Sequence, residues 1–318
     1  MIHQGIGGYF ELELPDRGGF LHDDGILLNS GRNALEYVLR SLPDVRHLWI
    51  PYYTCEVILE PVRKLGIAFS FYRIDAALEI RDTIDLQLGD YLLYTNYFGI
   101  KDHYVQKLAE HYGTRLIVDN AQALYADPVP GTSTIYSPRK FVGIPDGGIA
   151  CCRFGIDVNQ FEQDNSYDRC SHLLKRIDLG SAAGYHDFRE NSGLLVDQPI
   201  RKMSRLTERM LRAIDFDAVK RKRKKNFQIL NERLQKGNEI SFLKDSFECP
   251  MVYPFLGKEH SLKERLIKNG VFVATFWPNV SKWDDQSSLE SRLAQDLVCL
   301  PVDQRYGELE MERIVDLI

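Results

Sequence analysis

The sequence predicts an α/β fold in which a large, mostly parallel sheet with helices on both faces precedes a smaller carboxyl-terminal α+β domain. From the start to about residue 155, short apolar runs typical of strands alternate with segments of helical periodicity. Such alternation favours parallel strands joined by helices that cover both faces of the sheet. Beyond residue 205 the pattern changes to long helices with a few short apolar runs. We therefore expect one domain over residues 1–205 and a second over residues 206–318.

The first domain is expected to contain six strands and three helices. The strands are short apolar runs bounded by turn residues, at residues 47–53, 67–74, 91–99, 115–121, 133–137 and 148–154. The helices show apolar residues at helical spacing, at residues 30–42, 54–64 and 101–112. Ser30 is expected to cap the first of these helices.

The rest of the chain gives a different pattern. Residues 156–203 are polar and weakly periodic, so we expect them to form loop. Beyond them we expect helices at residues 204–214, 216–236, 261–270 and 288–297 and at the carboxyl end, strands at residues 251–256 and 271–277, and a last apolar run, LVCLPVD. The basic run 220–225 is interpreted as the solvated face of a helix that turns Phe216, Val219 and Phe227 inward.

The composition argues against several classes of protein. A net charge of −5 does not suit a nucleic-acid-binding surface, and no apolar run is long enough to cross a membrane. The amino end lacks the basic start and apolar core of a signal peptide, so we expect a cytoplasmic protein. Six cysteines without CxxC spacing favour reduced thiols, and eight histidines without ligand spacing favour no metal site.

The stretch IYSPRKFVGIPDGG places Lys140 in apolar surroundings beside a glycine-rich turn. Asp119 ends the buried run LIVD, at the rim where parallel sheets bind ligands. Ser30 and Gly31 open a helix whose free N–H groups favour a phosphate, and Ser137 adds a hydroxyl beside the lysine. Together these groups match pyridoxal 5'-phosphate, which needs a lysine for a Schiff base, a carboxylate for the pyridine nitrogen and a phosphate cradle. Taken singly, each also has an ordinary explanation as a helix cap, a turn residue or a solvated lysine.

The same residues lie in motifs that resemble those of DegT/StrS-type aminotransferases, a family of pyridoxal-phosphate enzymes of fold type I that often act on nucleotide-linked sugars. The motifs span nearly the whole chain and are LNSGRNALEYVL, WIPYYTCEVILEPVRKLGIAFSFYRID, LIVDNAQALYA, SPRKFVGIPDGG, MSRLTERMLRAIDFDAVKRKRKKNFQIL and LVCLPVDQRYGELEMERI. The resemblance implies that Lys140 is the Schiff-base lysine and Asp119 the partner of the pyridine nitrogen. The other cofactor contacts that it implies are Gln122 at the ring hydroxyl and, at the phosphate, Gly31, Arg32 and Ser137.

The chain departs from the motifs of this family at several positions. Arg32 replaces a threonine at the phosphate, and Cys55 replaces the aromatic residue that stacks on the cofactor ring. Ile200 stands where the family has an asparagine that reaches across the dimer, and Pro145 and Asp146 replace a Gly-Glu pair. We interpret Cys55 as a small buried residue at the cofactor, since the sequence gives its thiol no activating partner. These departures indicate a divergent branch.

The resemblance implies a homodimer that moves an amino group from a glutamate-like donor to a keto-sugar carried on a nucleotide, in polysaccharide or secondary-metabolite biosynthesis. Candidate substrate contacts are Asn96, Tyr97 and Arg201, and Arg201 is also a candidate for a phosphate contact across the subunit interface. A large anionic substrate requires an open, basic-rimmed cleft. Segments 156–203 and 275–288 supply side chains for such a cleft or, equally, for an exposed loop surface: Arg176, Arg189, Arg201, Lys202, Trp277 and Trp283.

Two alternatives stay open on the sequence alone. One is a lyase or dehydratase that uses the same cofactor without net amino transfer. The other is a relative that has lost catalysis and acts as a binding or regulatory partner, because a fold does not by itself imply an activity.

Overall fold

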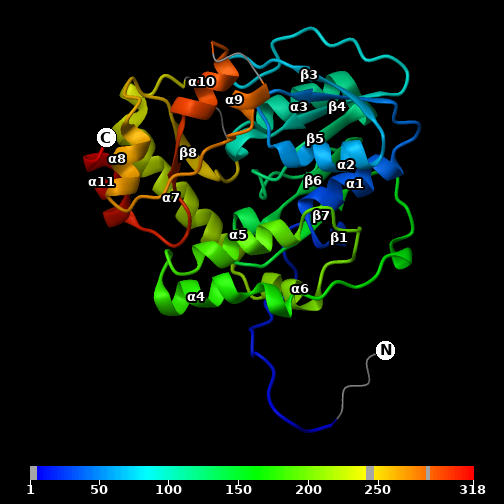
Figure 1. Ribbon diagram of the computed structural model, residues 1–318, viewed down its shortest axis with the longest axis horizontal. Helices are drawn as coiled ribbons and strands as arrows, with labels where there is room; N and C mark the ends of the chain where they lie inside the picture. The colour runs from blue at the N-terminus through cyan, green and yellow to red at the C-terminus, as the bar shows by residue number, and fades with distance from the viewer. Residues whose placement is uncertain (1–5, 241–246, 284–286) are drawn as a thin grey trace.

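The computed structural model describes residues 6–240, 247–283 and 287–318. Its centre is a seven-stranded sheet with the strand order β1-β7-β6-β5-β4-β2-β3 (Figure 1). The strands are β1 (Ile26–Leu28), β2 (His47–Pro51), β3 (Ala68–Tyr72), β4 (Asp90–Thr95), β5 (Leu116–Asn120), β6 (Ser133–Tyr136) and β7 (Gly148–Cys151). β2 to β6 pair in parallel, and β7 runs antiparallel to β1 and β6. The predicted α/β class with a mostly parallel sheet is confirmed, and only the three-residue edge strand β1 was not expected.

Helices cover both faces of this sheet because the side chains of its strands alternate between the two faces. In β5, Ile117 lies in one apolar cluster with α1 (Gly31–Ser41) and α2 (Leu59–Lys64). Leu116 and Val118 lie in a second cluster with α3 (Asp102–Tyr112). Ser30 caps α1 as predicted, because its hydroxyl accepts a hydrogen bond from the backbone N–H of Asn33 at 3.2 Å.

Most of the described carboxyl-terminal part, from residue 216 on, lies beside the sheet, away from α1 (Figure 1). Its elements are α6 (Arg205–Arg212), α7 (Phe216–Leu234), α8 (Leu262–Lys268), α9 (Val280–Trp283), α10 (Leu289–Asp296), α11 (Glu308–Asp316) and the antiparallel pair β8 (Val252–Phe255) and β9 (Val298–Pro301). One apolar cluster runs from Phe20 to Ile314 through both parts, so the domain division at residue 205 stays a prediction. Within the described residues, no helix combines the length and apolar character needed to cross a membrane.

The prediction of loop for residues 156–203 is wrong, because two helices form there. They are α4 (Ser171–Leu179) and α5 (Tyr185–Leu194), which lie together at one end of the molecule (Figure 1). α4 buries only His172 and α5 only Asn191. α4 does carry apolar residues at helical spacing, Leu173, Leu174 and Ile177, but the polar character of residues 156–203 as a whole led to the prediction of loop.

The strand predicted at residues 271–277 does not form either. β9 pairs with β8 along one edge, and at its other edge only Ala274 forms an isolated bridge, with Cys299. The apolar residues of this segment serve other contacts: Val271 and Trp277 are buried, while Phe272 is exposed. An apolar run can therefore enter the core at its ends without pairing as a strand.

The basic run 220–225 is solvated only in part. Val219 and Phe227 are buried as predicted, and four of the basic side chains, Arg221, Lys222, Lys224 and Lys225, are exposed. Arg223, however, is 2% exposed and donates hydrogen bonds to backbone carbonyls of three other residues. The interpretation of the whole run as a solvated face is wrong for this residue.

A buried ion pair joins the segment that contains α4 to the glycine-rich turn before β7. The carboxylate of Asp146, which is fully buried, accepts hydrogen bonds from Arg169 at 2.6 and 3.0 Å and from the Thr207 hydroxyl at 2.5 Å. Arg169 also reaches the carboxylate of Asp164 at 2.6 Å. Removing one partner of such a pair costs about 3–5 kcal/mol, so this network holds residues 164–169 firmly in place.

Candidate active site

The carboxylate of Asp119 lies at the end of β5, on the sheet face that α1 covers. In the parallel pairing of β4 with β5, Asp119 stands beside Thr95. Alternation along the strand turns the next residue, Asn120, toward α3 instead. Asp119 is 6% exposed, and its carboxylate accepts a hydrogen bond from the backbone N–H of Ala121 at 2.9 Å. Burial raises the pKa of Asp119, and the ammonium of Lys140 partly offsets this rise.

Lys140 follows β6 at the end of a single 3₁₀ turn, Pro138–Lys140. Its backbone N–H donates to the carbonyl of Ser137 at 3.1 Å, and that of Phe141 donates to the carbonyl of Pro138 at 2.8 Å. Phe141 and Val142 are buried, whereas the lysine itself is exposed. The backbone under the lysine is therefore fixed while its amine keeps freedom to move.

Lys140 shares one space with Asp119 and Cys55. Burial raises the pKa of Asp119 and of Cys55, and the nearby ammonium of Lys140 lowers the pKa of each of these two groups. The charge of Lys140 therefore reaches both the Asp119 carboxylate and the Cys55 thiol, which lie at or just beyond the carboxyl ends of β5 and β2, where parallel sheets bind ligands. The structure thus brings together the two residues that the sequence predicts to be catalytic.

The amino-terminal end of α1 lies against the turn that precedes Lys140. A Cβ atom on Gly31 would come within 3.3 Å of the Ser137 Cβ, so glycine permits this close approach. β7 passes nearer still, because a Cβ on Gly148 would lie 2.1 Å from the carbonyl oxygen of Ser30. The first N–H groups of an eleven-residue helix therefore lie beside the Ser137 hydroxyl. This arrangement suits a phosphate group.

Two arginines add positive charge to this cradle. Arg32 donates to the carbonyl of Leu195 at 2.8 Å, and its Nε lies 3.3 Å from the Glu60 carboxylate. Arg139 donates to the Ser192 hydroxyl at 3.0 Å. Arg139 was not singled out from the sequence, where its only signal was its position directly before Lys140. Burial, together with the charge of Arg32, lowers the pKa of Arg139 to about 10. The two guanidinium groups therefore repel each other, and a bound anion would relieve that repulsion.

Cys55 follows β2 in a segment that the carboxyl-terminal part holds in place. Burial raises the pKa of the Cys55 thiol, which disfavours the thiolate. The carbonyl of the preceding residue, Thr54, accepts a hydrogen bond from the side-chain amide of Asn279 at 2.9 Å. The ring of Tyr53 packs edge-on against Trp277, with 5.1 Å between ring centroids. The sequence gave no signal for Asn279, because the contact spans 225 residues.

Several buried polar atoms in residues at or just beyond the carboxyl ends of the central strands have no hydrogen-bond partner within the described residues. They lie at the ends of β2, β4 and β5 and are Tyr53 Oη, Thr54 Oγ1, Thr95 Oγ1 and Gln122 Nε2. The other amide atom of Gln122, Oε1, accepts from the backbone N–H of Phe98 at 3.0 Å, which leaves Nε2 as a buried donor. Buried polar atoms rarely lack partners in folded proteins, so this group suits a polar ligand.

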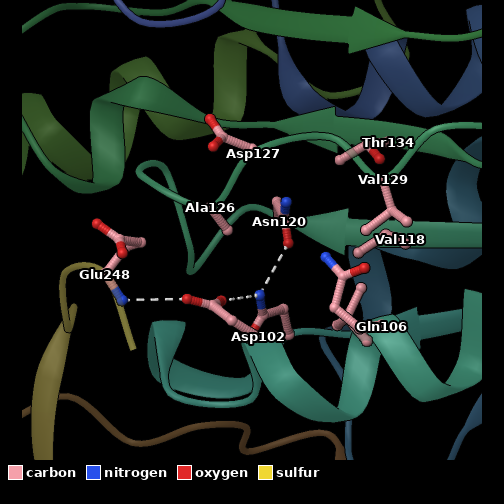
Figure 2. A pocket seen from close by; sticks show the side chains of 11 residues that line it. Asp102, Gln106, Val118, Asn120, Ala126, Asp127, Val129, Thr134 and Glu248 are labelled. Atoms are coloured by element: carbon pink, nitrogen blue, oxygen red, sulfur yellow. Dashed lines mark hydrogen bonds between the residues drawn. The ribbon is translucent and has the colours of Figure 1, made fainter. Parts of the chain in front are cut away.

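Asn96 and Tyr97, which the sequence analysis places at the substrate, are both fully buried. The amide of Asn96 donates to the Asp102 carboxylate at 2.8 Å and to Asn120 Oδ1 at 3.1 Å (Figure 2). These side chains line a cavity of about 140 Å³ on the α3 side of the sheet. The hydroxyl of Tyr97 donates to the carbonyl of Tyr53 at 2.9 Å. The structure therefore places Asn96 on the opposite sheet face from the predicted catalytic pair.

The basic residues predicted for a substrate cleft lie in two places, one at residues 201–202 and one on the paired helices α4 and α5. Arg201 lies 3.7 Å from the Asp164 carboxylate of its own chain. Lys202 is half-buried beside it, and its backbone bridges to Leu28. Arg176 and Arg189 are exposed on α4 and α5. A contact of Arg201 with a second subunit stays a prediction.

Of the two tryptophans predicted for the same cleft, Trp277 is a core residue and Trp283 is partly buried. Trp277 is 6% exposed and packs on Tyr53, Tyr97 and Phe276. Trp283 lies 5.1 Å from the ring of Phe71, at the edge of the cluster that α1 and α2 form with the sheet. Their expected role at a cleft rim is therefore corrected to packing.

The sequence matches no family model and no curated protein, but its structure is similar to solved structures. DesV from S. venezuelae, solved in complex with a ketimine intermediate, gives a TM-score of 0.65 at 16% identity over 92% of this chain and 83% of that chain. The putative sugar aminotransferase Spr1654 from Streptococcus pneumoniae, in its PMP form, gives 0.64 at 14% identity over 92% and 86%. A DegT/DnrJ/EryC1/StrS aminotransferase from Brucella abortus gives 0.59 at 14% identity over 92% and 84%.

This chain has the fold of the sugar aminotransferases. The resemblance to DegT/StrS-type aminotransferases is thereby confirmed for the fold, including the type I sheet. Within the sugar-aminotransferase fold, Asp119, Lys140 and the start of α1 lie at the carboxyl ends of the parallel strands. That is the edge at which α/β sheets bind their ligands.

We predict that the change Asp119→Asn stabilises the ligand-free protein increasingly as the pH rises. Burial raises the folded-state pKa of Asp119, so folding favours the protonated acid. The stability that the protonated Asp119 gives the wild-type protein is fully present below the unfolded-state pKa of 3.8. It is lost as the pH rises from that value through the higher folded-state pKa. An asparagine has no charge to bury, so its advantage in free energy of unfolding should grow from pH 3 to pH 7 in urea denaturation. An advantage that does not change with pH would contradict the raised pKa.

Proposed function

We propose that this protein is a pyridoxal 5'-phosphate-dependent aminotransferase that moves an amino group from a glutamate-like donor to a keto-sugar linked to a nucleotide. The observation that carries the proposal is that the buried Asp119 carboxylate ends β5 while Lys140 follows the neighbouring strand β6, in a turn whose Ser137 packs against Gly31 at the start of α1. The fold that the chain shares with DesV and Spr1654 supports it. The sugar part of the proposal rests on the same likeness, because Spr1654 is described as a putative sugar aminotransferase.

The residues around Asp119 fit this cofactor. The phosphate would be held by the N–H groups and side chains of Gly31, Arg32, Ser137 and Arg139. The buried Nε2 of Gln122, which lacks a partner within the described residues, would donate to the ring hydroxyl. Cys55 would lie beside the ring and offer less contact area than an aromatic residue. We therefore expect weaker ring binding, with the two arginines compensating at the phosphate.

The chemistry then follows from two side chains. When bound, the cofactor supplies a ring that takes up the electron pair left when the donor carbon loses its proton. Asp119 would hold a proton on the pyridine nitrogen, and burial strengthens the attraction between this carboxylate and the positive nitrogen. Lys140 would hold the cofactor covalently until the donor amine displaces it. Its freed amine, exposed on a fixed turn, would then act as the base that takes up the proton released by the donor carbon and, in the reverse half-reaction, as the acid that returns a proton to the acceptor carbon.

We also propose a homodimer that uses α4 and α5 at its interface. These helices leave large apolar side chains exposed: Leu174, Ile177, Leu179, Tyr185, Phe188 and Leu194. Exposed apolar groups gathered on neighbouring helices are typical of protein–protein interfaces. The same segment contacts the phosphate cradle, since Ser192 and Leu195 accept hydrogen bonds from Arg139 and Arg32. A second subunit bound here would therefore lie next to the site.

The covalent link is the first test of the proposal. We expect Lys140→Ala to keep its fold, because the side chain is exposed, but to lose both the visible absorbance of the linked cofactor and its fixation by borohydride. Lys107→Ala, which removes another exposed lysine, should retain both signals. A borohydride-fixed cofactor in the Lys140→Ala variant would show that another lysine is the anchor.

The second test is the transfer of the amino group. We expect glutamate to convert the bound cofactor to its amine form in a single turnover, and nucleotide-linked 3- or 4-keto-sugars to convert it back. In Asp119→Asn the rate should fall by roughly 10²-fold or more, since an amide cannot hold the pyridinium proton by charge. Conversion by small keto-acids alone would rule out the sugar acceptor, and cofactor binding without conversion by any donor would favour a lyase or a non-catalytic protein.

The dimer is tested by sedimentation equilibrium. We expect the wild-type protein to sediment as a dimer and Ile177→Glu to shift it toward monomer, because Ile177 is 81% exposed in the single chain. Leu309→Glu is the matched control, since Leu309 is 84% exposed on α11. A monomeric wild type, or equal effects of the two changes, would contradict an interface on α4 and α5.

A further inference from the structure

Arg223 is a buried cation whose hydrogen bonds go to neutral oxygens. It lies in α7, is 2% exposed, and burial lowers the pKa of its guanidinium. Nη2 donates to the carbonyl of Phe141 at 3.0 Å, and Nη1 donates to that of Met251 at 3.0 Å and, more weakly, to that of Pro250 at 3.4 Å. Nε donates to the side-chain oxygen of Gln304 at 3.0 Å. One side chain therefore ties three separate segments of the chain to α7.

Burying a guanidinium group only to fill space is unfavourable in free energy. Moving a guanidinium out of water costs several kcal/mol, and apolar residues of similar volume often serve equally well or better. The ring of Phe141 lies 4.7 Å from the guanidinium carbon and offsets part of that cost by a cation–π contact. The five donors of an arginine, held in a rigid fork, can nevertheless fix several carbonyls at once, which an apolar residue cannot do. The carbonyls that it binds therefore indicate its role.

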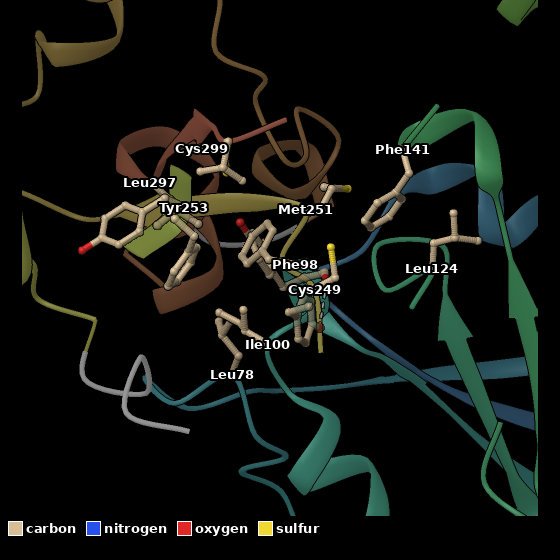
Figure 3. Close-up of a cluster of buried hydrophobic side chains, with 14 of the residues drawn as sticks. Leu78, Phe98, Ile100, Leu124, Phe141, Cys249, Met251, Tyr253, Leu297 and Cys299 are labelled. Carbon is tan, nitrogen blue, oxygen red and sulfur yellow. Dashed lines mark hydrogen bonds between the residues drawn. The ribbon is translucent and has the colours of Figure 1, made fainter. Parts of the chain in front are cut away.

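The decisive carbonyl is that of Phe141, the residue directly after Lys140. It accepts a second hydrogen bond from the side-chain amide of Gln304 at 2.9 Å. Two donors from the carboxyl-terminal part thus fix a single carbonyl of the lysine turn. The side chain of Phe141 points toward Met251 and Cys249 in the apolar cluster between the two parts (Figure 3). Phe141, the residue after Lys140, is therefore held both by hydrogen bonds to its carbonyl and by the packing of its ring.

We propose that Arg223 and Gln304 are positioning residues that fix Lys140 opposite Asp119 and couple its position to the carboxyl-terminal part of the chain. The inference rests on the proposed function of Lys140. The lysine backbone is held on one side by its hydrogen bond to Ser137 and on the other by these two donors. A lysine that must react with an aldehyde and later move a proton requires placement within about 1 Å, since larger errors cost up to about 10²-fold in rate.

The contact also joins the lysine to elements that are distant in the sequence. Arg223 belongs to α7, Met251 precedes β8 and Gln304 follows β9. Any displacement of these elements would pull on the Phe141 carbonyl and hence on the turn Pro138–Lys140. Substrate contacts made by the carboxyl-terminal part can thereby change the position of the reactive amine.

The test compares Arg223→Met, Arg223→Lys and Gln304→Leu in the full-length protein. In the absence of cofactor, amide hydrogen exchange of the peptide covering residues 138–147 should be about tenfold faster in Arg223→Met than in wild type. With pyridoxal 5'-phosphate added, the rate at which Lys140 captures it, followed by borohydride trapping and peptide mapping, should fall about tenfold. Arg223→Lys should restore part of both values, and Gln304→Leu should show smaller changes in the same direction.

Two controls separate positioning from general stability. Leu230→Ala opens a cavity in the core under the same helix, because Leu230 is fully buried, and it leaves the hydrogen bonds to the Phe141 carbonyl in place. It should lower the melting temperature without changing exchange at residues 138–147 or the capture rate. Arg221→Met, which removes an exposed arginine from the same helix, should behave as wild type.

The outcomes distinguish the inference from the proposed function. If wild-type protein captures no cofactor at Lys140, the proposed function fails, while the exchange measurement still decides whether Arg223 holds the turn. If wild type captures cofactor and Arg223→Met does so at the same rate with unchanged exchange, the inference is overturned. Equal effects of Arg223→Met and Leu230→Ala at matched stability would also overturn it, since both residues would then act only through folding.

Discussion

The carboxylate of Asp119 is held where water cannot solvate it, at the end of a central strand with parallel neighbours on both sides. A charge in that position needs a positive partner, and the structure supplies only part of one, since Lys140 lowers the pKa that burial raises. The neighbouring strand ends add buried donors and hydroxyls without partners within the described residues. A ligand with a positive charge and polar groups would compensate the charge of Asp119 and supply partners for these polar atoms. A protonated pyridine ring with a hydroxyl group would have both properties. The site is therefore built around an incompletely compensated charge.

The alternation of side chains along the strands gives this charge its surroundings. The same two-residue period that turns Asp119 and Thr95 toward α1 turns Asn120 and Asn96 toward α3. The cavity beside Asn96 and Asn120 thus lies on the α3 side of the sheet, and the sheet separates it from Asp119 (Figure 2). Asn96 directly follows a strand residue that faces the site, which made it a plausible substrate contact from the sequence. Because Asn96 lies one residue beyond Thr95, its side chain points to the opposite face of the sheet, away from the candidate site.

Local patterns predicted the features that local physics determines. Strands β2 to β7, the cap at Ser30 and the places of Asp119 and Lys140 after neighbouring strands follow from periodicity, turn chemistry and the parallel arrangement of strand ends. α4 and α5 were missed because the polar character of residues 156–203 as a whole outweighed the short apolar pattern of each helix. The burial of Arg223 was missed for a different reason. Its partners are carbonyls up to 82 residues away, and a carbonyl has no sequence signature.

Contacts with carbonyls also explain how the site can keep its geometry while its side chains diverge. The carboxyl-terminal part holds the segment before Cys55 through the Thr54 carbonyl, and it holds the lysine turn through the Phe141 carbonyl. Every residue type offers the same oxygen at these positions, so the side chains that face the cofactor can change without loss of the hydrogen bond. In the proposed site, a thiol at residue 55 would alter what the cofactor ring touches but not where the segment lies. The carboxyl-terminal part thus holds the segments before Cys55 and after Lys140.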